Sequence, residues 1–368
     1  MSLRTHSPIY HFFLLLLVLF FTGAAYGKNS RLELIHADVS RGVVREGVPI
    51  RILEGNVQAR QDTLELFCDQ AIYNETGGYI LLKSRVRLLR GVDTLLAKQV
   101  KYFEKSQTAV ASGNVIVKRP GQKLTADSLT YNYRNDEIHV RGKVSIIDAP
   151  KNVWVNSRLA DYLPKDSLAV LRENVHLRQV DSTYSDTVHV YCKELRYFSG
   201  KDRIATAVGE VHFHQAALHA YGDSAVYFLD REEVILEKGP RAIQENNEIT
   251  GNSLRLFLQG TSLDRIEVKG NARAVSVDDS TLNKENRLLG KEIVMFFKDK
   301  KIRELRAISN ARSFYFLKEE EEDRGINSAS ADTIKALFKN NEVDSIVVIG
   351  GAQGIYYPQD YKGPVKER

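Results

Sequence analysis

Cysteine is scarce in this chain: its 368 residues include only two, Cys68 and Cys192. Two cysteines are too few for a disulfide framework or a four-cysteine zinc site. Both occupy the same position of a sequence repeat described below, four repeats apart. At two strands per repeat and about 4.8 Å per strand, they would lie roughly 38 Å apart, whereas a disulfide needs Cα atoms within about 7 Å. We therefore expect two buried thiols that act as small hydrophobic side chains.

Catalytic motifs are also missing. The sequence contains no Gly-x-Ser-x-Gly, no His-Glu-x-x-His and no Gly-x-x-x-x-Gly-Lys-Ser/Thr. An aspartate does recur, always after a small residue predicted to point inward, at Asp38, Asp69, Asp127 and Asp223. Its recurrence at the same place in each repeat favours a structural role over a catalytic one. We expect no enzymatic activity and no cofactor.

Long apolar runs are absent except for the ten residues Phe12 to Phe21. Arg4 precedes this run, and Ala25-Tyr26-Gly27 places small residues where a signal peptidase cuts. The run is too short for a membrane span, and no cysteine follows it for lipidation. Residues 1–27 are therefore predicted to be a secretory signal peptide, with an uncleaved anchor as the alternative, and the mature chain to be an exported protein.

Charge of one sign is not in strong excess. The chain has 52 Lys and Arg against 47 Asp and Glu, and loss of residues 1–27 removes one Arg and no acid. So mild a balance does not favour a nucleic-acid partner, although it is compatible with an anionic amphiphile.

What the sequence has in abundance is one repeated unit of 29 residues, best seen from Gly113 to Arg141. Eight apolar offsets of this unit recur in copies that begin at Gly55, Ser84 and Gly209. Of these 32 positions 31 are hydrophobic, where a hydrophobic content of 43% would give about 14 by chance. The mature chain is therefore a repeat protein.

The spacing of two within each unit predicts strands with one buried face. Short turn sequences, such as Arg119-Pro120-Gly121-Gln122 and Arg134-Asn135-Asp136, join these strands, and connections this short make antiparallel hairpins. We expect Gly142 to lie on the inward face of a regular strand. The spacing of three between Ala126 and Leu129 predicts a bulge or corner at Asp127-Ser128, so that each strand bends once near its middle. The predicted fold is all-β: about 19 bent antiparallel strands stacked into an open trough or jellyroll.

The repeats also suggest boundaries. Residues 28–238 form regular repeats, 239–358 a looser continuation and 359–368 a polar tail. The excess length of the last two full units falls at Asp278 to Leu288 and Lys318 to Ser330, which we interpret as inserted surface loops.

His212, His214 and His219 are the best candidates for a metal site. However, Val211 and Phe213 take the inward positions of the same strand, so His212 and His214 are expected to face solvent. We predict no metal site.

The units Gly113-Asn114-Val115 and Ala126-Asp127-Ser128-Leu129-Thr130-Tyr131 resemble those of the OstA-like family, as does the opening Leu34-Ile35-His36-Ala37-Asp38. That family includes the periplasmic lipopolysaccharide-transport protein LptA and the amino-terminal domain of the outer-membrane translocon LptD. The resemblance covers about residues 32 to 357.

The resemblance implies a β-jellyroll whose apolar groove carries the acyl chains of lipopolysaccharide. It also implies edge strands that join an inner-membrane transport complex and an LptD-type translocon, and end-to-end self-association. Here those edges would be Leu32 to Ala37 and Asp344 to Ile349. The lipid-binding groove would consist of inward residues: Val57, Leu66, Tyr73, Ile80, Val86, Leu88, Leu95, Val100, Tyr102, Val115, Val117, Leu124, Leu129, Tyr131, Ile138, Val140, Val211, Phe213 and Tyr227.

The alternative is a structural or scaffold repeat protein with a filled core. Small inward residues near the predicted bends, such as Ala126 and Cys68, are compatible with an underfilled interior, but the sequence leaves open whether the core is packed.

Overall fold

The structure is a computed structural model that describes residues 32–61, 63–180, 187–259, 262–279, 284–319, 322–339 and 342–365. The predicted signal peptide lies outside these residues. Among the residues described, no helix is both long enough and apolar enough to cross a membrane.

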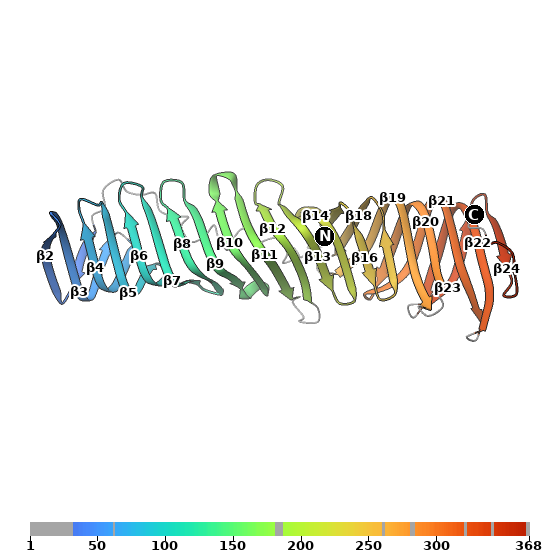
Figure 1. The fold of residues 1–368 in the computed structure, drawn as a ribbon, viewed down its shortest axis with the longest axis horizontal. Coiled ribbons are helices and arrows are strands. Elements are labelled where there is room, and N and C mark those ends of the chain that lie inside the picture. The colour runs from blue at the N-terminus through green and yellow to red at the C-terminus, as the bar shows by residue number, and fades with distance from the viewer. Residues whose placement is uncertain are drawn as a thin grey trace, which may run out of the picture. The chain divides into compact units, whose positions relative to one another are not determined.

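The described chain is almost entirely antiparallel β-structure, which confirms the predicted fold class (Figure 1). The strands are β1 (Glu33–His36), β2 (Val39–Arg45), β3 (Val48–Gln61), β4 (Leu64–Asn74), β5 (Tyr79–Arg90), β6 (Asp93–Phe103), β7 (Thr108–Arg119), β8 (Gln122–Asn132), β9 (Glu137–Asp148), β10 (Val153–Leu163), β11 (Leu168–Val180), β12 (Thr187–Phe198), β13 (Ile204–Gln215), β14 (Leu218–Phe228), β15 (Glu233–Glu237), β16 (Arg241–Gln244), β17 (Asn247–Thr250), β18 (Ser253–Gln259), β19 (Ser262–Asp279), β20 (Lys284–Lys298), β21 (Lys301–Glu319), β22 (Glu322–Lys339), β23 (Glu342–Ile349) and β24 (Gln353–Tyr357). Single 3-10 turns occur at Ala149–Lys151, Pro164–Asp166 and Leu229–Arg231.

Some labelled strands are the two halves of one bent strand. β1 and β2 both pair with β3, and β23 and β24 both pair with β22. The same relation holds for β15 with β16 and for β17 with β18. Counting each such pair once leaves 20 bent strands in the described residues, close to the 19 predicted.

The chain divides into two compact units. The amino-terminal unit comprises described residues 32–180 with 193–203, and the carboxy-terminal unit comprises 187–192 with 204–365. The division falls within β12, upstream of residue 238, where the sequence repeats loosen. Loosening of the repeat and division of the fold are therefore separate features.

Each odd-numbered strand of the regular repeats bends at two consecutive residues with left-handed backbone. In β7 these are Gly113 and Asn114, with φ of +79° and +51°, and together they lie opposite one residue of β8, Asp127. The bend thus falls opposite Asp127, where the sequence predicts a bulge or corner, but the extra residue is in the strand of the Gly-Asn pair. Gly142, with φ of +74°, likewise begins a left-handed pair and does not continue a regular pleat. Glycine and asparagine recur here because they tolerate this conformation.

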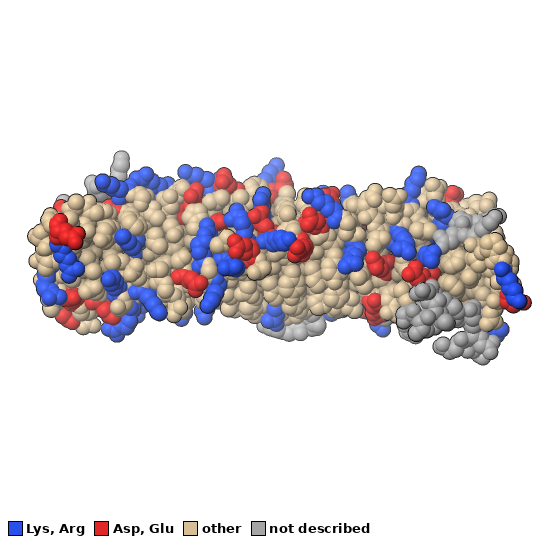
Figure 2. Space-filling model, in the orientation of Figure 1, with Lys and Arg blue, Asp and Glu red and all other residues tan. Residues whose placement is uncertain are grey.

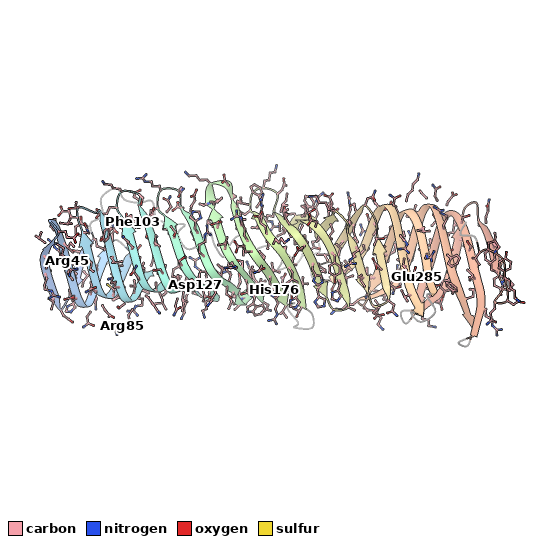
Figure 3. The ribbon with its side chains drawn as sticks, viewed as in Figure 1. Arg45, Arg85, Phe103, Asp127, His176 and Glu285 are labelled. Carbon is pink, nitrogen blue, oxygen red and sulfur yellow. The ribbon has the colours of Figure 1, made fainter. Side chains whose placement is uncertain are left out.

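The recurring aspartate covers these bends. The Asp38 amide donates to the carbonyl of Gly55 at 3.0 Å, and Asn56 Nδ2 donates to Asp38 Oδ2 at 3.1 Å. At the next bend, Arg85, an exposed residue labelled in Figure 3, forms an ion pair with Asp69 at 2.6 Å. These contacts assign the aspartates the structural role expected from their recurrence.

Apart from residues 280–283 and 320–321, which lie outside the described residues, the predicted insertions are parts of longer strands and not loops. β20 already begins at Lys284, and Leu288 pairs with Ala274 and Ser313. β22 begins at Glu322, and Ile326 pairs with Phe316. Both excess segments keep enough alternation to extend the hairpins, so their extra residues lengthen strands.

Acidic and basic side chains are interspersed on the face shown in Figure 2. The core lies on the opposite side of the strands, where Val115 and Val140 are fully buried. In both units, inward residues from the two sides of the bends face one another across the core.

Candidate functional site

The candidate site is the interior of the amino-terminal unit. Two half-sheets enclose it: half-sheet A carries the hairpins at 61–64, 90–93 and 119–122, and half-sheet B those at 74–79, 103–108 and 132–137. The bends described above join the half-sheets.

Twelve of the 19 predicted groove residues are buried and the other seven are half-buried. The half-buried ones are Tyr73, Ile80, Leu88, Leu95, Tyr102, Phe213 and Tyr227. Val211, Phe213 and Tyr227 belong to the carboxy-terminal unit, so the structure does not bring the whole predicted set into one unit. That these residues bind lipid remains a prediction.

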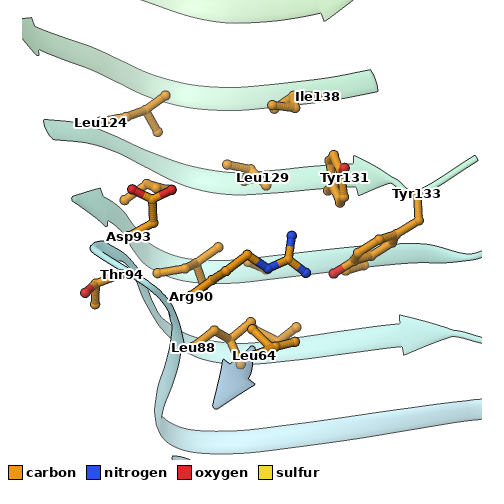
Figure 4. Close-up of a pocket in the computed structure, with 15 residues that line it drawn as sticks. Leu64, Leu88, Arg90, Asp93, Thr94, Leu124, Leu129, Tyr131, Tyr133 and Ile138 are labelled. Carbon is orange, nitrogen blue, oxygen red and sulfur yellow. The ribbon is translucent and has the colours of Figure 1, made fainter. Parts of the chain in front are cut away.

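A cavity of about 60 Å³ lies between the half-sheets (Figure 4). Its lining includes eight predicted residues: Leu88, Leu95, Val100, Val117, Leu124, Leu129, Tyr131 and Ile138. The volume is about twice the share of liquid occupied by one water molecule. The interior is therefore nearly filled, with a small apolar space between its two walls.

One border of this cavity, which we call the mouth, is polar. It consists of Arg90, Asp93 and Thr94 from half-sheet A and Tyr133 from half-sheet B. In Figure 4 the guanidinium group of Arg90 points toward the ring of Tyr133. Sequence reasoning missed these four residues because Arg90, Asp93 and Thr94 lie at the ends of strands beside a turn, and Tyr133 lies in a turn. The strand parity could have found Arg90, which continues the inward series of Val86 and Leu88.

Arg119 holds the carboxylate of Asp93 in place at the mouth. Its Nε donates to Asp93 Oδ1 at 2.8 Å and its Nη2 to Asp93 Oδ2 at 2.6 Å, and both side chains are largely buried. On the other side, the ring of Tyr133 makes edge contacts with Tyr131 and Tyr102, at centroid distances of 4.4 and 5.8 Å. The mouth is thus held by a paired carboxylate and a group of tyrosines.

The inward polar row continues along half-sheet A. Gln122 Nε2 donates to Asp148 Oδ2 at 3.0 Å, and Lys151 Nζ lies 3.7 Å from the same oxygen. Asp148 is 1% exposed, and burial lowers the pKa of Lys151 despite this carboxylate. Apolar wall and polar border therefore run side by side within one unit.

The carboxy-terminal unit has its own interior cavity, of about 50 Å³. Met295, Leu305 and Ile334 line it together with Ser276 and Ser313. Elsewhere in this unit, Gln244 Nε2 donates to the carbonyl of Lys300 at 2.9 Å and so joins two hairpins far apart in sequence.

The histidines form two rows of stacked rings on this unit. One row contains Tyr191, His212 and Tyr221, and the other His189, His214 and His219, with neighbouring centroids 4.4–5.7 Å apart. His212 Nε2 and His219 Nδ1 share a hydrogen bond of 3.1 Å. Burial first, and neighbouring histidines second, lower the pKa of both. Across the described chain, no three His, Cys, Asp or Glu residues come together as metal ligands.

Both cysteines are buried thiols, as predicted, with Cys68 4% and Cys192 7% exposed. Burial, aided by the charge of Asp69, raises the pKa of Cys68 to about 11.

Comparison with known proteins agrees with the resemblance. A family model described as OstA-like protein matches residues 29–187. This part of the chain is similar to the OstA-like family. The OstA-like match ends close to where the two units divide. No curated protein matches the chain.

Among solved structures, the chain is similar in part to LptH of Pseudomonas aeruginosa, described as the LptA homologous periplasmic component of the conserved lipopolysaccharide transport device. Sequence identity is 16%, and the match covers 40% of this chain and 82% of LptH with a TM-score of 0.21.

Proposed function

We propose that this protein is a non-enzymatic, periplasmic member of the lipopolysaccharide-transport type, whose interior carries the acyl chains of the lipid toward the outer membrane. The observation that carries the proposal is the apolar cavity between half-sheets A and B, inside the region that is OstA-like. Each CH₂ group moved from water into such an interior gains about 0.8 kcal/mol. Several acyl chains would therefore be held strongly if the interior admits them.

An acyl chain needs more room than 60 Å³, so the half-sheets must move apart to accept it. Strand pairing runs along each half-sheet, whereas apolar side chains pack between the two halves. Parting the halves would therefore exchange contacts with protein side chains for contacts with lipid. The left-handed pairs at the bends, such as Gly113-Asn114, are the natural hinges for this movement.

The partners would bind at the terminal strands. In the amino-terminal unit, β1 and β2 pair with β3 and expose Leu34, Ile35 and Val44. In the carboxy-terminal unit, β23 pairs with β22 and exposes Val347 and Ile349. An unpaired strand edge with apolar side chains can add a strand from another protein. We propose that these edges join an inner-membrane transport complex, an LptD-type translocon, or further copies of this chain.

The small size of both cavities favours a second candidate, a scaffold repeat protein with a filled core. Photo-crosslinking in cells separates the two. A photoreactive residue would replace Leu88, which is half-buried in the cavity wall, or buried Leu129 or Tyr131, and Thr130 on the outward face is the control. Lipopolysaccharide adducts at the inward positions and not at Thr130 support the carrier. Folded, exported protein without adducts supports the scaffold.

A further inference from the structure

The outward side of half-sheet A in the amino-terminal unit carries an excess of positive charge. Strands β3 to β11 bring its side chains into two cross-strand rows, one from Gln58 to His176 and the other from Arg60 to Arg178. We call these two rows the outer face. Glu65 is their one acid. Their lysines and arginines are all exposed: Arg60, Arg87, Lys118, Lys123 and Arg178.

Two like charges lie opposite each other near the centre of the outer face. Lys118 of β7 pairs in register with Lys123 of β8, and the next residues of their row are Thr94 and Ile147. Among the residues described, neither lysine forms an ion pair. Like charges directly opposite each other destabilise an antiparallel pair of strands. An anion bound outside the sheet would relieve this repulsion.

The outward side of half-sheet B differs, because its arginines are paired with acids. Arg141 and Arg172 lie 2.7 and 2.5 Å from the carboxylate of Asp161, and Arg172 also binds Glu194 at 2.8 Å. Positive charge is thus neutralised on one outward side of the unit and left in excess on the other. The excess is therefore a local feature of the outer face.

The outer face also carries large apolar side chains. Arg87 lies over the ring of Phe67 at 4.4 Å, and Arg178 over the ring of Trp154 at 4.6 Å, so basic and aromatic groups are in contact. Basic residues among aromatic and aliphatic ones are typical of surfaces that bind anionic membranes, and tryptophan favours the level of the headgroups. The apolar residues of the face are all half-buried: Phe67, Leu89, Leu96, Ile116, Ile147 and Trp154.

A hollow of about 620 Å³ opens where the outer face meets the bends. Phe67, Arg87 and Lys98 are among the residues that line it. Asp69 lines it too, but Arg85 pairs with this carboxylate at 2.6 Å. Lys98 holds the repeat position that is aspartate in the repeats before and after it. The hollow therefore adds a place of net positive charge, large enough for a lipid headgroup, at the border of the face.

We propose that the outer face is a docking surface for a lipid bilayer with anionic headgroups. Lys118 and Lys123 lie against the lipid phosphates in this arrangement, and Trp154 lies at the level of the headgroups. The apolar side chains favour a bilayer over a wholly polar polyanion, which would gain nothing from Leu96 or Ile147. This surface is separate from the interior, so the inference does not depend on the interior admitting lipid.

Trp154 is the only tryptophan of the chain, so its fluorescence reports directly on the outer face. The mature full-length protein is mixed with vesicles of phosphatidylcholine alone, or of phosphatidylcholine and phosphatidylglycerol in equal parts, each with brominated acyl chains that quench tryptophan. We expect the protein to sediment with the anionic vesicles and Trp154 to be quenched, and neither to occur with phosphatidylcholine alone. Added salt should weaken the binding.

Lys118→Gln combined with Lys123→Gln should weaken binding to the anionic vesicles by about thirtyfold, since two basic residues are lost from the contact. The protein should stay folded, because the substitutions remove a repulsion between strands. Lys105→Gln combined with Lys165→Gln is the matched control. It lowers the net charge equally, from exposed turns of half-sheet B, and should leave the binding nearly unchanged.

Four results would overturn the docking surface. Equal weakening by the control pair would mean that net charge, and not this face, attracts the vesicles. Sedimentation with Trp154 unquenched would place another surface on the bilayer. Quenching without sedimentation would mean uptake of single lipids into the protein. Absence of binding, or equal binding to both kinds of vesicle, would remove the role of the basic residues. None of these results bears on the carrier function, which the crosslinks at Leu129 and Tyr131 test separately.

Discussion

The carboxylate of Asp127 lies directly over Gly142. A Cβ at position 142 would come within 2.2 Å of Asp127 Oδ2, and the backbone there has a φ of +74°. A side chain at this position would therefore meet both a strained backbone and a steric clash.

Gly142→Ala should destabilise the amino-terminal unit by about 2–3 kcal/mol, since each of these two effects costs on the order of 1 kcal/mol or more. Gly78→Ala is the control, because Gly78 also has a positive φ, of +60°, but a Cβ there would have no atom within 4 Å. It should cost about half as much. Urea unfolding followed by circular dichroism measures both. Equal losses would mean that Asp127 moves aside freely.

Asp161 is the centre of a charged network on the outward side of β10. His139 Nδ1, Arg141 Nη1 and Arg172 Nη1 lie 2.8, 2.7 and 2.5 Å from its carboxylate, and Arg172 also binds Glu194 at 2.8 Å. Burial alone would raise the pKa of Asp161, but the bonds to His139, Arg141 and Arg172 outweigh it and lower the pKa.

Asp161→Ala should cost about 2 kcal/mol, less than for a fully buried pair, because the three partners are partly hydrated. Its effect should vanish at low pH. Since the folded-state pKa is lowered, the stabilisation is present above the unfolded-state pKa near 4 and is lost as the pH falls through the folded-state value. Thermal unfolding at neutral and acid pH checks this, and a cost that is unchanged at acid pH would contradict it.

Mild acid should destabilise the carboxy-terminal unit through the stacked histidines. The pKa values of His212 and His219 are lowered in the folded state, so the unfolded chain takes up protons first as the pH falls below about 6.5. Stability is then greatest above that pH and decreases below it. His214 stacks on both of these rings and His189 stacks on His214, and Arg241 lies over Tyr221 at 4.7 Å, which adds positive charge to the cluster.

Replacing both His212 and His219 with Asn should flatten the dependence of the unfolding midpoint on pH between 7 and 5. His36→Asn, in the amino-terminal unit, serves as the control and should leave the slope for the carboxy-terminal unit unchanged. An identical slope in the double variant would place the pH dependence elsewhere.

The thiol of Cys68 should react slowly in the native protein. With a pKa of about 11, roughly one molecule in a thousand carries the thiolate at pH 8. Labelling with iodoacetamide should be at least a hundredfold faster in denaturant, and mass spectrometry without reductant should show no Cys68–Cys192 bond. Rapid native labelling, or that bond, would contradict the buried positions.

Proline substitutions in β23 should distinguish the association of this edge with partners from the stability of the fold. Adjacent residues of an edge strand turn their amides alternately toward the neighbouring strand and away from it. Of Val347→Pro and Val348→Pro, one should therefore destabilise the β22–β23 pair, and the other should keep the fold but lose association with partners or further copies. Size-exclusion chromatography and complementation of growth report the difference. Full complementation by both variants would show that this edge is not a working surface.

Strand parity predicted the greater part of this fold. A period of two placed Val115, Leu124 and Tyr131 on the buried face without any knowledge of the structure. The extra residue of each bend was assigned to the wrong strand because the left-handed pair is not always marked by glycine. Ser84 and Arg85 adopt it with φ of +61° and +49° in an otherwise regular repeat. Where tertiary contacts stabilise a strained backbone conformation, the residue types at that position give little indication of it.

The polar border was missed for a different reason. Arg90 and Asp93 look like ordinary hairpin residues, and only the approach of the second half-sheet, which brings Tyr133 near them, makes them part of a cavity. That approach depends on the bend, so strand parity gives the inward direction of Arg90 but not the neighbouring half-sheet. The two long hairpins at β19–β20 and β21–β22 were misjudged because length in excess of the repeat was interpreted as inserted loops, whereas strand pairing continues into these segments.

The alternation of a bulged strand with an unbulged one also makes this architecture modular. In the regular repeats, strands of 12 residues alternate with strands of 11, from β5 through β10, so every pair of strands restores the same register. Duplication or loss of one 29-residue unit would therefore change the number of strands by two without shifting any side chain to the wrong face. Each such step would alter the length of the sheet by about 10 Å. The length of the sheet could thus change in fixed increments during evolution, by unequal recombination alone, while the apolar interior stays continuous from repeat to repeat.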